Sequence, residues 1–319
     1  MQIIAYAWEQ HPSSNYRAYQ PLLELTRRGH MVAINTSLDE LTPTDDELAE
    51  IAESFDVAFL SRYTEPEAVQ LVRRLKAAGV PVVWDYDDDM LGSRKGRTDD
   101  ESVRYVTGIR AMIEVVDLLT TTSDRLAERF LEEGARHVVA IPNYVTRPSL
   151  EAPRRPHDGL VLGYIGWVDH QADWERLGLE ETICELLEDH DQLRVETVGP
   201  LDFKLPAERY TRREPVPFDR LPQLLAGFDI ALAPLSDIPG NYGRSDIKLK
   251  EYAIAGVPWL ASPIGPYVGL GEEQGGRLVA DEEWFEQLDR LILDKRARRK
   301  LAKKGQRWAL AHTLPGNSR

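Results

Sequence analysis

The sequence predicts an α/β protein built from two domains of similar kind. Short apolar runs rich in β-branched residues alternate with stretches of helical period along the whole chain, as in βαβ units with parallel sheets. With 319 residues, the chain is longer than one hydrophobic core typically supports. We expect one domain over 1–146, a Pro- and Arg-rich linker over 147–159 and a second domain over 160–285. Residues 286–319 are expected to form a helical segment that packs back across the domains.

The first half contains short apolar runs that predict strands: Ile3–Trp8, Met31–Thr36, Val57–Ser61, Val80–Asp85, Leu118–Thr121 and Val138–Pro142. Stretches with apolar residues at helical spacing lie between them: Tyr16–Arg28, Glu65–Ala78, Glu101–Val116 and Asp124–Glu133. This order predicts a parallel sheet covered by helices.

The second half repeats the pattern. Its predicted strands are Leu160–Ile165, Arg194–Val198, Ile230–Pro234, Val257–Ser262 and Gly276–Val279. Its predicted helices are Trp174–Asp189, Leu221–Ala226 and Asp246–Ala255, and the last 35 residues also have a helical pattern. Because open α/β sheets bind ligands beyond the carboxyl ends of their strands, we expect an active site in a cleft between the domains.

Composition excludes several classes of protein. The chain has 53 acidic and 39 basic side chains, a formal charge of −14, which argues against a protein that mainly binds nucleic acid. Its single cysteine, Cys184, forms no internal disulfide. No run approaches the roughly 20 apolar residues of a membrane span, and the start lacks a basic targeting region. We expect a cytoplasmic protein.

The segment from Asp229 to Gly256 carries most of the functional information. It reads as a buried strand, a loop of Gly, Pro and Asn, and a helix that begins at Ser245 or Asp246 and ends at Gly256. Free N–H groups and the helix dipole make such a helix start suitable for a phosphate. Lys248 lies in its first turn, where a cation is disfavoured unless an anion is close.

Glu251 falls in the stripe of this helix that should be packed, because Ile247 and Ile254 lie on the same face. A carboxylate there needs hydrogen-bond partners, which the hydroxyls of a ribose would supply. The alternative is that Lys248 and Glu251 form an ordinary i, i+3 pair on a solvated face.

The segment Ser245–Pro258, followed by Leu260–Ser262, resembles the donor-binding segment of GT-B glycosyltransferases, in particular family 4 and related bacterial enzymes. Further matches lie, in order, at Val82–Met90, Leu119–Ala127, Ile141–Asn143 and Gly163–Gly166. The resemblance implies two Rossmann-like domains that face each other across a cleft. It also implies transfer of a sugar from a UDP- or GDP-sugar to an acceptor hydroxyl, with retained configuration and no metal or other cofactor. The acceptor is left open: a glycan, a lipid-linked sugar, a protein or a small molecule.

The resemblance also implies roles for residues at the matching positions. Glu251 would hold the donor ribose, and Ser245, Asp246 and Lys248 the diphosphate. Gly166 and Trp167 would approach the phosphates and the sugar, and Val216 would flank the base. Because bond breaking leaves negative charge on the diphosphate, a fixed cation lowers the barrier, and Lys248 is the first candidate, followed by Arg244.

The sequence departs from the family pattern at three places. Family 4 enzymes often have Glu where this chain has Gly243, so Asn241 or Tyr242 would contact the sugar instead. Basic residues that often follow the glycine matching Gly166 are absent. A histidine often found after the fourth strand is replaced by Asp87, which becomes a catalytic candidate.

Asp87 and Asp88 belong to the acidic run Asp85–Asp89, which also fits the DxD pattern by which GT-A enzymes bind a metal. A second complete α/β series argues against that fold, so we expect no metal site. The two carboxylates then either contact the sugar or acceptor, or lie on a solvated turn.

Three further residues are expected at the cleft. Tyr16 and Arg17 follow the first strand, where Arg17 could meet a phosphate or an anionic acceptor, whereas Tyr16 could simply pack the helix start. His170 has an ordinary pKa close to neutrality and could transfer protons, or lie exposed in a polar loop.

The segment Lys295–Arg307 has eight basic residues in thirteen. It is either the polar face of a closing helix or a peripheral contact with an anionic membrane. Two other functions also stay open: a GT-B epimerase that acts on the nucleotide sugar itself, and a non-catalytic nucleotide-sugar binder.

Overall fold

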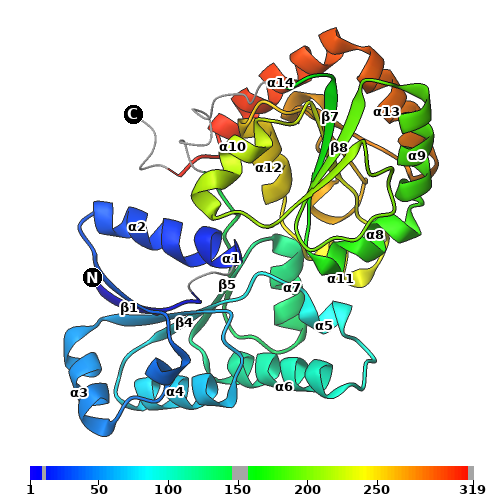
Figure 1. The fold of residues 1–319 in the computed structure, drawn as a ribbon. Helices are drawn as coiled ribbons and strands as arrows, with labels where there is room; N and C mark the ends of the chain where they lie inside the picture. The colour runs from blue at the N-terminus through cyan, green and yellow to red at the C-terminus, as the bar shows by residue number, and fades with distance from the viewer. Residues whose placement is uncertain (9–11, 146–156, 315–319) are drawn as a thin grey trace. The chain divides into compact units, whose positions relative to one another are not determined.

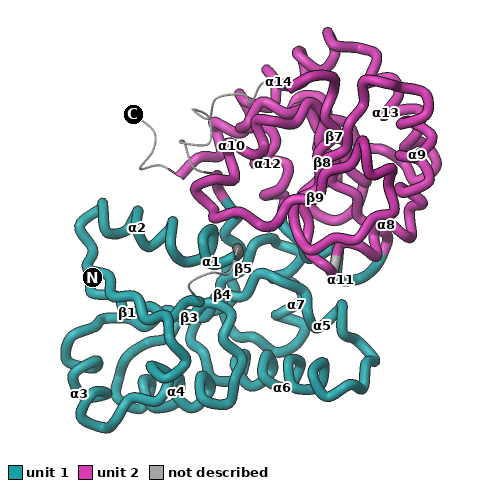
Figure 2. The backbone as a smooth tube through the Cα atoms, in the orientation of Figure 1, with its two compact units in different colours: residues 1–143, 238–245 teal, residues 144–237, 246–319 magenta. Residues whose placement is uncertain are grey.

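The computed structural model describes residues 1–8, 12–145 and 157–314. The chain forms two compact units. Residues 1–143 and 238–245 make unit 1, and residues 144–237 and 246–319 make unit 2 (Figure 2). Most of the expected linker, 147–156, lies outside the described residues.

Unit 1 contains a six-stranded parallel sheet with the order β2-β1-β3-β4-β5-β6 (Figure 1). Its strands are β1 (Gln2–Tyr6), β2 (Met31–Asn35), β3 (Val57–Ser61), β4 (Val82–Asp85), β5 (Leu118–Thr121) and β6 (Val138–Ala140). Its helices are α1 (Pro12–Ser14), η1 (Asn15–Tyr19, a π-helix), α2 (Gln20–Arg27), η2 (Leu38–Leu41), α3 (Asp45–Ser54), α4 (Pro66–Ala77), α5 (Met90–Ser93), α6 (Asp100–Val115), α7 (Asp124–Glu132) and α11 (Pro239–Tyr242).

Alternating side chains of β1 pack on opposite faces of this sheet, as strand geometry requires. Ile4 and Tyr6 join the larger core with α4, α6 and α7. Ile3 and Ala5 pack against Leu22 of α2 on the other face. Both faces of the sheet are therefore covered by helices, which explains why its strands read as continuous apolar runs.

Unit 2 contains a second six-stranded parallel sheet, with the order β12-β11-β10-β7-β8-β9. Its strands are β7 (Leu160–Ile165), β8 (Leu193–Val198), β9 (Tyr210–Arg213), β10 (Ile230–Ala233), β11 (Trp259–Ala261) and β12 (Gly276–Leu278). Its helices are η4 (Val168–His170), α8 (Gln171–Arg176), α9 (Leu179–Asp189), η5 (Phe218–Arg220), α10 (Leu221–Leu225), α12 (Ile247–Ile254), η6 (Gly265–Tyr267), η7 (Glu272–Gln274), η8 (Asp281–Glu283), α13 (Trp284–Leu293) and α14 (Lys295–Leu310).

The two sheets confirm the α/β fold with a parallel sheet in each half. Two expected elements differ in detail. The predicted helix Trp174–Asp189 is two helices, because Gly178 adopts a left-handed φ of 59° between them. The polar strand β9 at the sheet edge was not predicted, because its residues Tyr-Thr-Arg-Arg lack an apolar run.

The last helix, α14, packs on α12, the helix of the same unit that the sequence predicts to bind the sugar donor. Helix α14 contacts α12 and η7, and Leu301 and Ala309 are buried there. A Cβ on Gly275 would lie 2.5 Å from the Cα of Gly305, so only glycine permits this approach. Among the described residues, no helix is long and apolar enough to cross a membrane.

Candidate functional site

Arg17 joins the carboxyl ends of three strands of unit 1. The π-helix η1 places it after β1, where it is only 5% exposed. Its Nε and Nη2 donate to the carboxylate of Asp85 at the end of β4, with Nη2 at 2.6 Å from Oδ2. Nη2 also donates to the carbonyl of Thr121 at the end of β5, and Nη1 donates to Oδ1 of Asn143 beyond β6. Arg17 thus lies after the first strand, and its guanidinium is bonded to protein groups.

Asp85 is fully buried and also accepts a hydrogen bond of 2.6 Å from Thr120. Burial raises the pKa of Asp85, and the Arg17 guanidinium opposes that rise. Since the carboxylate already has an arginine and a hydroxyl as partners, it serves this ion pair rather than a metal. Asp85, the first carboxylate of the DxD pattern, thus binds Arg17 and Thr120.

A second arginine, Arg62, holds Asp87 of that pattern and the adjacent Asp88. Its Nη1 donates to Asp87 and, at 2.8 Å, to Oδ2 of Asp88. The guanidinium also lies over the Tyr86 ring, 5.5 Å from its centroid. Burial lowers the pKa of Arg62, but the carboxylates of Asp87 and Asp88 raise it by more. The pKa of Arg62 therefore lies well above its ordinary value, and the side chain stays charged. Arg62 follows β3 and has a φ of 67°, which among the described non-glycine residues is the only positive value.

The segment 238–245 leaves the second sheet after β10 yet belongs to unit 1. Its short helix α11 packs on α5. A Cβ on Gly243 would lie 2.7 Å from the Cβ of Asp89, and a Cβ on Gly240 would lie 2.7 Å from that of Ser93. Gly243, where family 4 enzymes often have Glu, is therefore required by packing in this chain.

The other sequence candidates of this segment form two contacts inside unit 1. Nε of Arg244 donates to Oδ1 of Asn241 at 2.8 Å, and Asn241 is fully buried. The amide of Asn143 donates to Oγ of Ser245 at 3.1 Å. Tyr242 is exposed, and Tyr16 is half-buried. The structure thus brings Arg17 and Ser245 together through Asn143.

In unit 2, helix α12 begins at the position that the sequence predicts. Asp246 is its N-cap residue, and Gly256, with φ of 73°, follows its end. The carboxylate of Asp246 pairs with Nζ of the buried Lys250 at 2.7 Å instead of capping the backbone. The side chain of Asp246 thus does not cap the first N–H groups of α12. A phosphate site at this helix end requires that these N–H groups are not used by a capping side chain.

Tyr252 ties α12 to the two strands whose carboxyl ends lie at the reversal of strand order. Its buried hydroxyl donates to the carbonyl of Leu232 in β10 and accepts from the N–H of Ile165 in β7. Burial raises the pKa of Tyr252 well above its ordinary value, so the hydroxyl keeps its proton. Ligands of open α/β sheets bind at such a reversal, here between β7 and β10.

Lys248 lies against the same strand end. Its Nζ atom is buried and stands 4.9 Å from the centroid of the Tyr164 ring. The Tyr164 hydroxyl would lie 2.8 Å from a Cβ on Gly166, so the ring contacts both residues. Trp167 follows and is 53% exposed. The structure therefore groups Lys248 with the Gly166 turn, as expected, while Glu251 is half-buried on the same helix.

Two further sequence candidates belong to unit 2. Nδ1 of His170 lies 3.3 Å from Oδ2 of Asp173, whose Oδ1 accepts bonds from the N–H and the hydroxyl of Ser236. His170 is thereby oriented at the edge where β7 and β10 end. Val216 lies in the loop after β9 and packs against the core.

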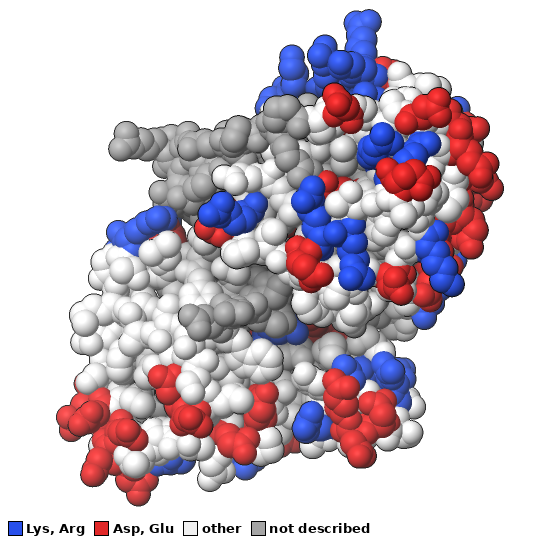
Figure 3. Space-filling view, in the orientation of Figure 1, with Lys and Arg blue, Asp and Glu red and all other residues white. Residues whose placement is uncertain are grey.

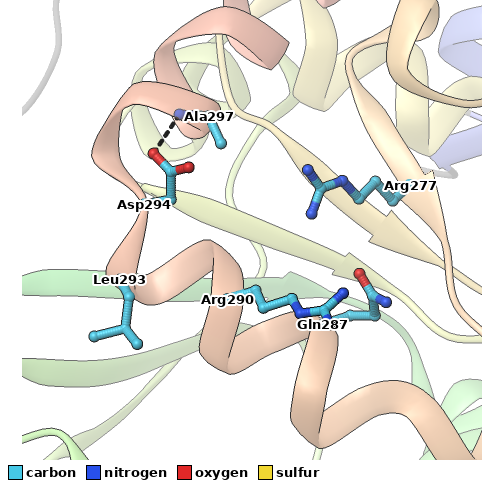
Figure 4. Close-up of a pocket in the computed structure, with 6 residues that line it drawn as sticks. All are labelled: Arg277, Gln287, Arg290, Leu293, Asp294 and Ala297. Carbon is cyan, nitrogen blue, oxygen red and sulfur yellow. Dashed lines mark hydrogen bonds between the residues drawn. The ribbon is translucent and has the colours of Figure 1, made fainter.

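Metal-ligand clusters and pockets of the described residues do not point to the sequence candidates. No group of three or more His, Cys, Asp or Glu that could hold a metal occurs among the described residues. A surface pocket lies between β12, α13 and α14 of unit 2 and is lined by Arg277, Gln287, Arg290, Leu293, Asp294 and Ala297 (Figure 4). Both arginines pair with carboxylates there, Glu272 and Glu286, and none of the sequence candidates lines this pocket.

Comparison with protein families gives one match. Residues 176–317 match the model of a family described as glycosyl transferase-like. Over these residues the chain is similar to glycosyl transferase-like domains. The matched segment contains α12 with Lys248 and Glu251, and the match confirms the enzyme class that the sequence predicts for this part of the chain. A comparison with curated proteins found no match.

Solved structures share the fold over nearly the whole chain. The HepE protein of Anabaena, solved in complex with UDP-glucose, is 17% identical, with 98% of this chain and 95% of that chain covered and a TM-score of 0.67. Sucrose-phosphate synthase from Thermosynechococcus elongatus is 16% identical, with 98% of this chain and 94% of that chain covered and a TM-score of 0.64. A putative UDP-N-acetylglucosamine 2-epimerase from Listeria monocytogenes is 14% identical, with 97% of this chain and 94% of that chain covered and a TM-score of 0.54. The GT-B fold is confirmed.

Sequence reasoning missed several residues of the site. The sequence did not single out Arg62 and Tyr164, because their partners are remote in the sequence. It did not single out Lys250, because only the structure shows that this side chain is buried. One signal for Arg62 was present in the sequence: a basic residue directly after a buried strand, at the edge where α/β proteins bind ligands.

Proposed function

We propose that this protein is a glycosyltransferase that moves a sugar from a nucleoside diphosphate sugar to an acceptor hydroxyl. The match of residues 176–317 to the glycosyl transferase-like family carries the proposal. UDP is the favoured nucleotide, because HepE, which shares the fold, was solved with UDP-glucose. GDP is the second possibility. Retained configuration and independence of a metal belong to the proposal as well.

The proposed donor site lies in unit 2 at the carboxyl ends of β7 and β10. The backbone turn at Gly166 and the start of α12 offer N–H groups to the diphosphate. Ser245 accepts a bond from Asn143, so its own hydroxyl hydrogen can be donated to a phosphate oxygen. Glu251 would accept hydrogen bonds from the ribose hydroxyls, and Val216 would flank the base.

Stabilisation of the leaving group is proposed to rest on Lys248, with Arg244 as a second cation. The bond between the anomeric carbon and the diphosphate breaks, and the electron pair stays with the diphosphate. A buried cation stabilises this charge more than an exposed one, because water does not screen it. Tyr164 holds the Lys248 ammonium in a fixed position through its ring.

The acceptor side is proposed at the carboxyl edge of the unit 1 sheet. Asp87 and Asp88 are held by Arg62, so they are fixed acceptors for hydroxyl groups. Tyr16 of the same unit is a further candidate for contact with the acceptor, and His170 stays a separate candidate in unit 2. Because Arg62 already holds both carboxylates, the proposed role of Asp87 and Asp88 is to position the acceptor.

A donor panel tests this function. Purified protein is incubated with UDP-glucose, UDP-N-acetylglucosamine or GDP-mannose and a set of glycan and lipid-linked acceptors, and nucleotide release is measured with and without EDTA. A donor at 100 times its Kd should also stabilise the fold by about 2.7 kcal/mol. No stabilisation by any donor and no release across the panel would contradict the proposal.

The epimerase and the non-catalytic binder are outcomes of the same experiment. An epimerase converts the donor when no acceptor is present, so the sugar recovered from UDP-N-acetylglucosamine alone is analysed for its epimer. A binder gives donor stabilisation without release or epimer. The shared fold of the putative epimerase does not favour it, because the transferase structures share the same fold.

A further inference from the structure

Helix α14 of unit 2 carries a stripe of exposed cations. Six of its eight basic side chains are exposed: Lys295, Arg296, Arg299, Lys300, Lys303 and Arg307. At 3.6 residues per turn they span roughly 140° of the helix surface. Leu301, Gly305 and Ala309 occupy the opposite side and are buried against the unit. We call these six residues the basic stripe.

The basic stripe forms few contacts with neighbouring carboxylates, although Glu273 lies near enough to Lys300 and Arg307 for their charges to lower its pKa. Among the described residues, none lies within ion-pair distance of any of its six members, whereas Lys304 on the flank of the helix pairs with Glu273. Space-filling Figure 3 shows Lys and Arg side chains gathered over α14 at the top of the view. Six cations without an ion-pair partner among the described residues thus gather on one helix face of a chain whose net charge is −14.

The same unit carries an acidic surface on another helix. Glu181, Glu185, Glu188 and Asp189 of α9 are exposed, and Figure 3 shows acidic side chains at the right-hand edge of the view. Helix α13 packs on both α9 and α14. An anionic plane would attract α14 and repel α9, so this charge separation gives unit 2 one preferred orientation on such a plane.

We propose that the basic stripe docks the protein on an anionic lipid bilayer. The stripe follows one 16-residue helix, and Leu293 and Leu310 are exposed near its two ends, where they can enter the headgroup region. Nucleic-acid surfaces usually add aromatic side chains for stacking. Trp308, the single aromatic residue of α14, packs against the core instead.

Electrostatic docking has a defined strength and salt dependence. A Lys or Arg near an anionic surface raises partitioning about fivefold, so loss of three cations should lower it on the order of 100-fold. The Debye length shrinks as salt rises, so partitioning at roughly 0.1 M salt should be largely lost at roughly 0.5 M. Docking requires neither donor nor acceptor and therefore goes beyond the proposed function.

The test is vesicle flotation of the full chain. Vesicles of phosphatidylcholine with about 30% phosphatidylglycerol are compared with pure phosphatidylcholine, for wild type and for the triple variant Arg299→Gln, Lys300→Gln, Lys303→Gln. The matched control replaces three exposed arginines of unit 1, Arg73→Gln, Arg104→Gln and Arg136→Gln. Thermal melts show whether each variant is folded.

We expect wild type and the control to float with anionic vesicles only, and the triple variant to remain unbound. Equal binding to both vesicle types, no binding of wild type, or wild-type binding by a folded triple variant would overturn the proposal. Binding of duplex DNA is measured in parallel for wild type and the triple variant. If wild type binds DNA through the stripe but does not bind vesicles, the anionic partner is a nucleic acid and the membrane proposal is wrong. Nucleotide release in solution is unaffected by any of these outcomes.

Discussion

The side-chain amide of Asn143 donates a hydrogen bond to the hydroxyl of Ser245, which lies 102 residues further along the chain. Both residues stand at ends of unit 1 segments, since the chain continues into unit 2 at Tyr144 and again at Asp246. The amide oxygen of Asn143 accepts from Arg17. One buried arginine thus orients the amide that holds Ser245, the last residue of unit 1 before the chain enters α12.

The Arg17–Asp85 pair is predicted to be essential for the stability of unit 1. Arg17→Met should lower the free energy of unfolding by about 3–5 kcal/mol, because it leaves the Asp85 carboxylate buried without a countercharge. Asp85→Asn in the same protein removes that charge and should recover part of the loss. Urea unfolding of wild type, single and double variants measures both values. A double variant no more stable than Arg17→Met would contradict this account.

Lys248→Met is predicted to separate catalysis from stability. The thioether chain keeps the packing against Tyr164 while the charge is removed, so turnover should fall about 100- to 1,000-fold with little change in melting temperature. Nucleotide release at saturating donor measures the effect.

The matched control is Lys250→Met, two residues along the same helix. This variant breaks the pair with Asp246 and should cost about 1 kcal/mol of stability. If the two variants lose turnover equally, Lys248 has no special role.

Arg62 is predicted to act on the acceptor side. Arg62→Ala removes the partner of Asp87 and Asp88, so the acceptor KM should rise about tenfold while the donor KM stays unchanged. Arg62→Gly should lose the same interaction, yet be more stable than Arg62→Ala by about 1 kcal/mol, because glycine adopts a φ of 67° without strain. Equal stability of both variants would show that this backbone conformation carries no cost.

Gly243→Glu, which restores the residue common in family 4 enzymes, is predicted to destabilise this chain. Its Cβ would approach that of Asp89 to 2.7 Å, so α11 must shift from α5 at a cost of about 1–3 kcal/mol. Gly271→Ala is the control, since a Cβ there meets nothing within 4 Å and its φ of 178° suits any residue. A stable, more active Gly243→Glu protein would instead place the family's sugar contact at this position.

Much of the fold was predictable because parallel α/β sheets bury their strands on both faces. Runs such as Val57–Ser61 and Leu160–Ile165 match the observed strands residue for residue. The start of α12 was also predictable, since its flanks carry Asp246 and Gly256. The strand β9 was not, because Arg212 and Arg213 lie at the sheet edge, where one face is open to solvent and no apolar pattern is required.

Local pattern and composition therefore determined the class of fold, the order of its elements and the helix that carries Lys248 and Glu251. Only the tertiary structure decided which charges meet. Arg17 and Asp85 are 68 residues apart, and Arg62 and Asp87 are 25 apart, and each pair meets because parallel strands end at one edge of the sheet. The physical reason is that periodicity records which side of an element is buried, whereas the partner of a buried charge depends on strand order.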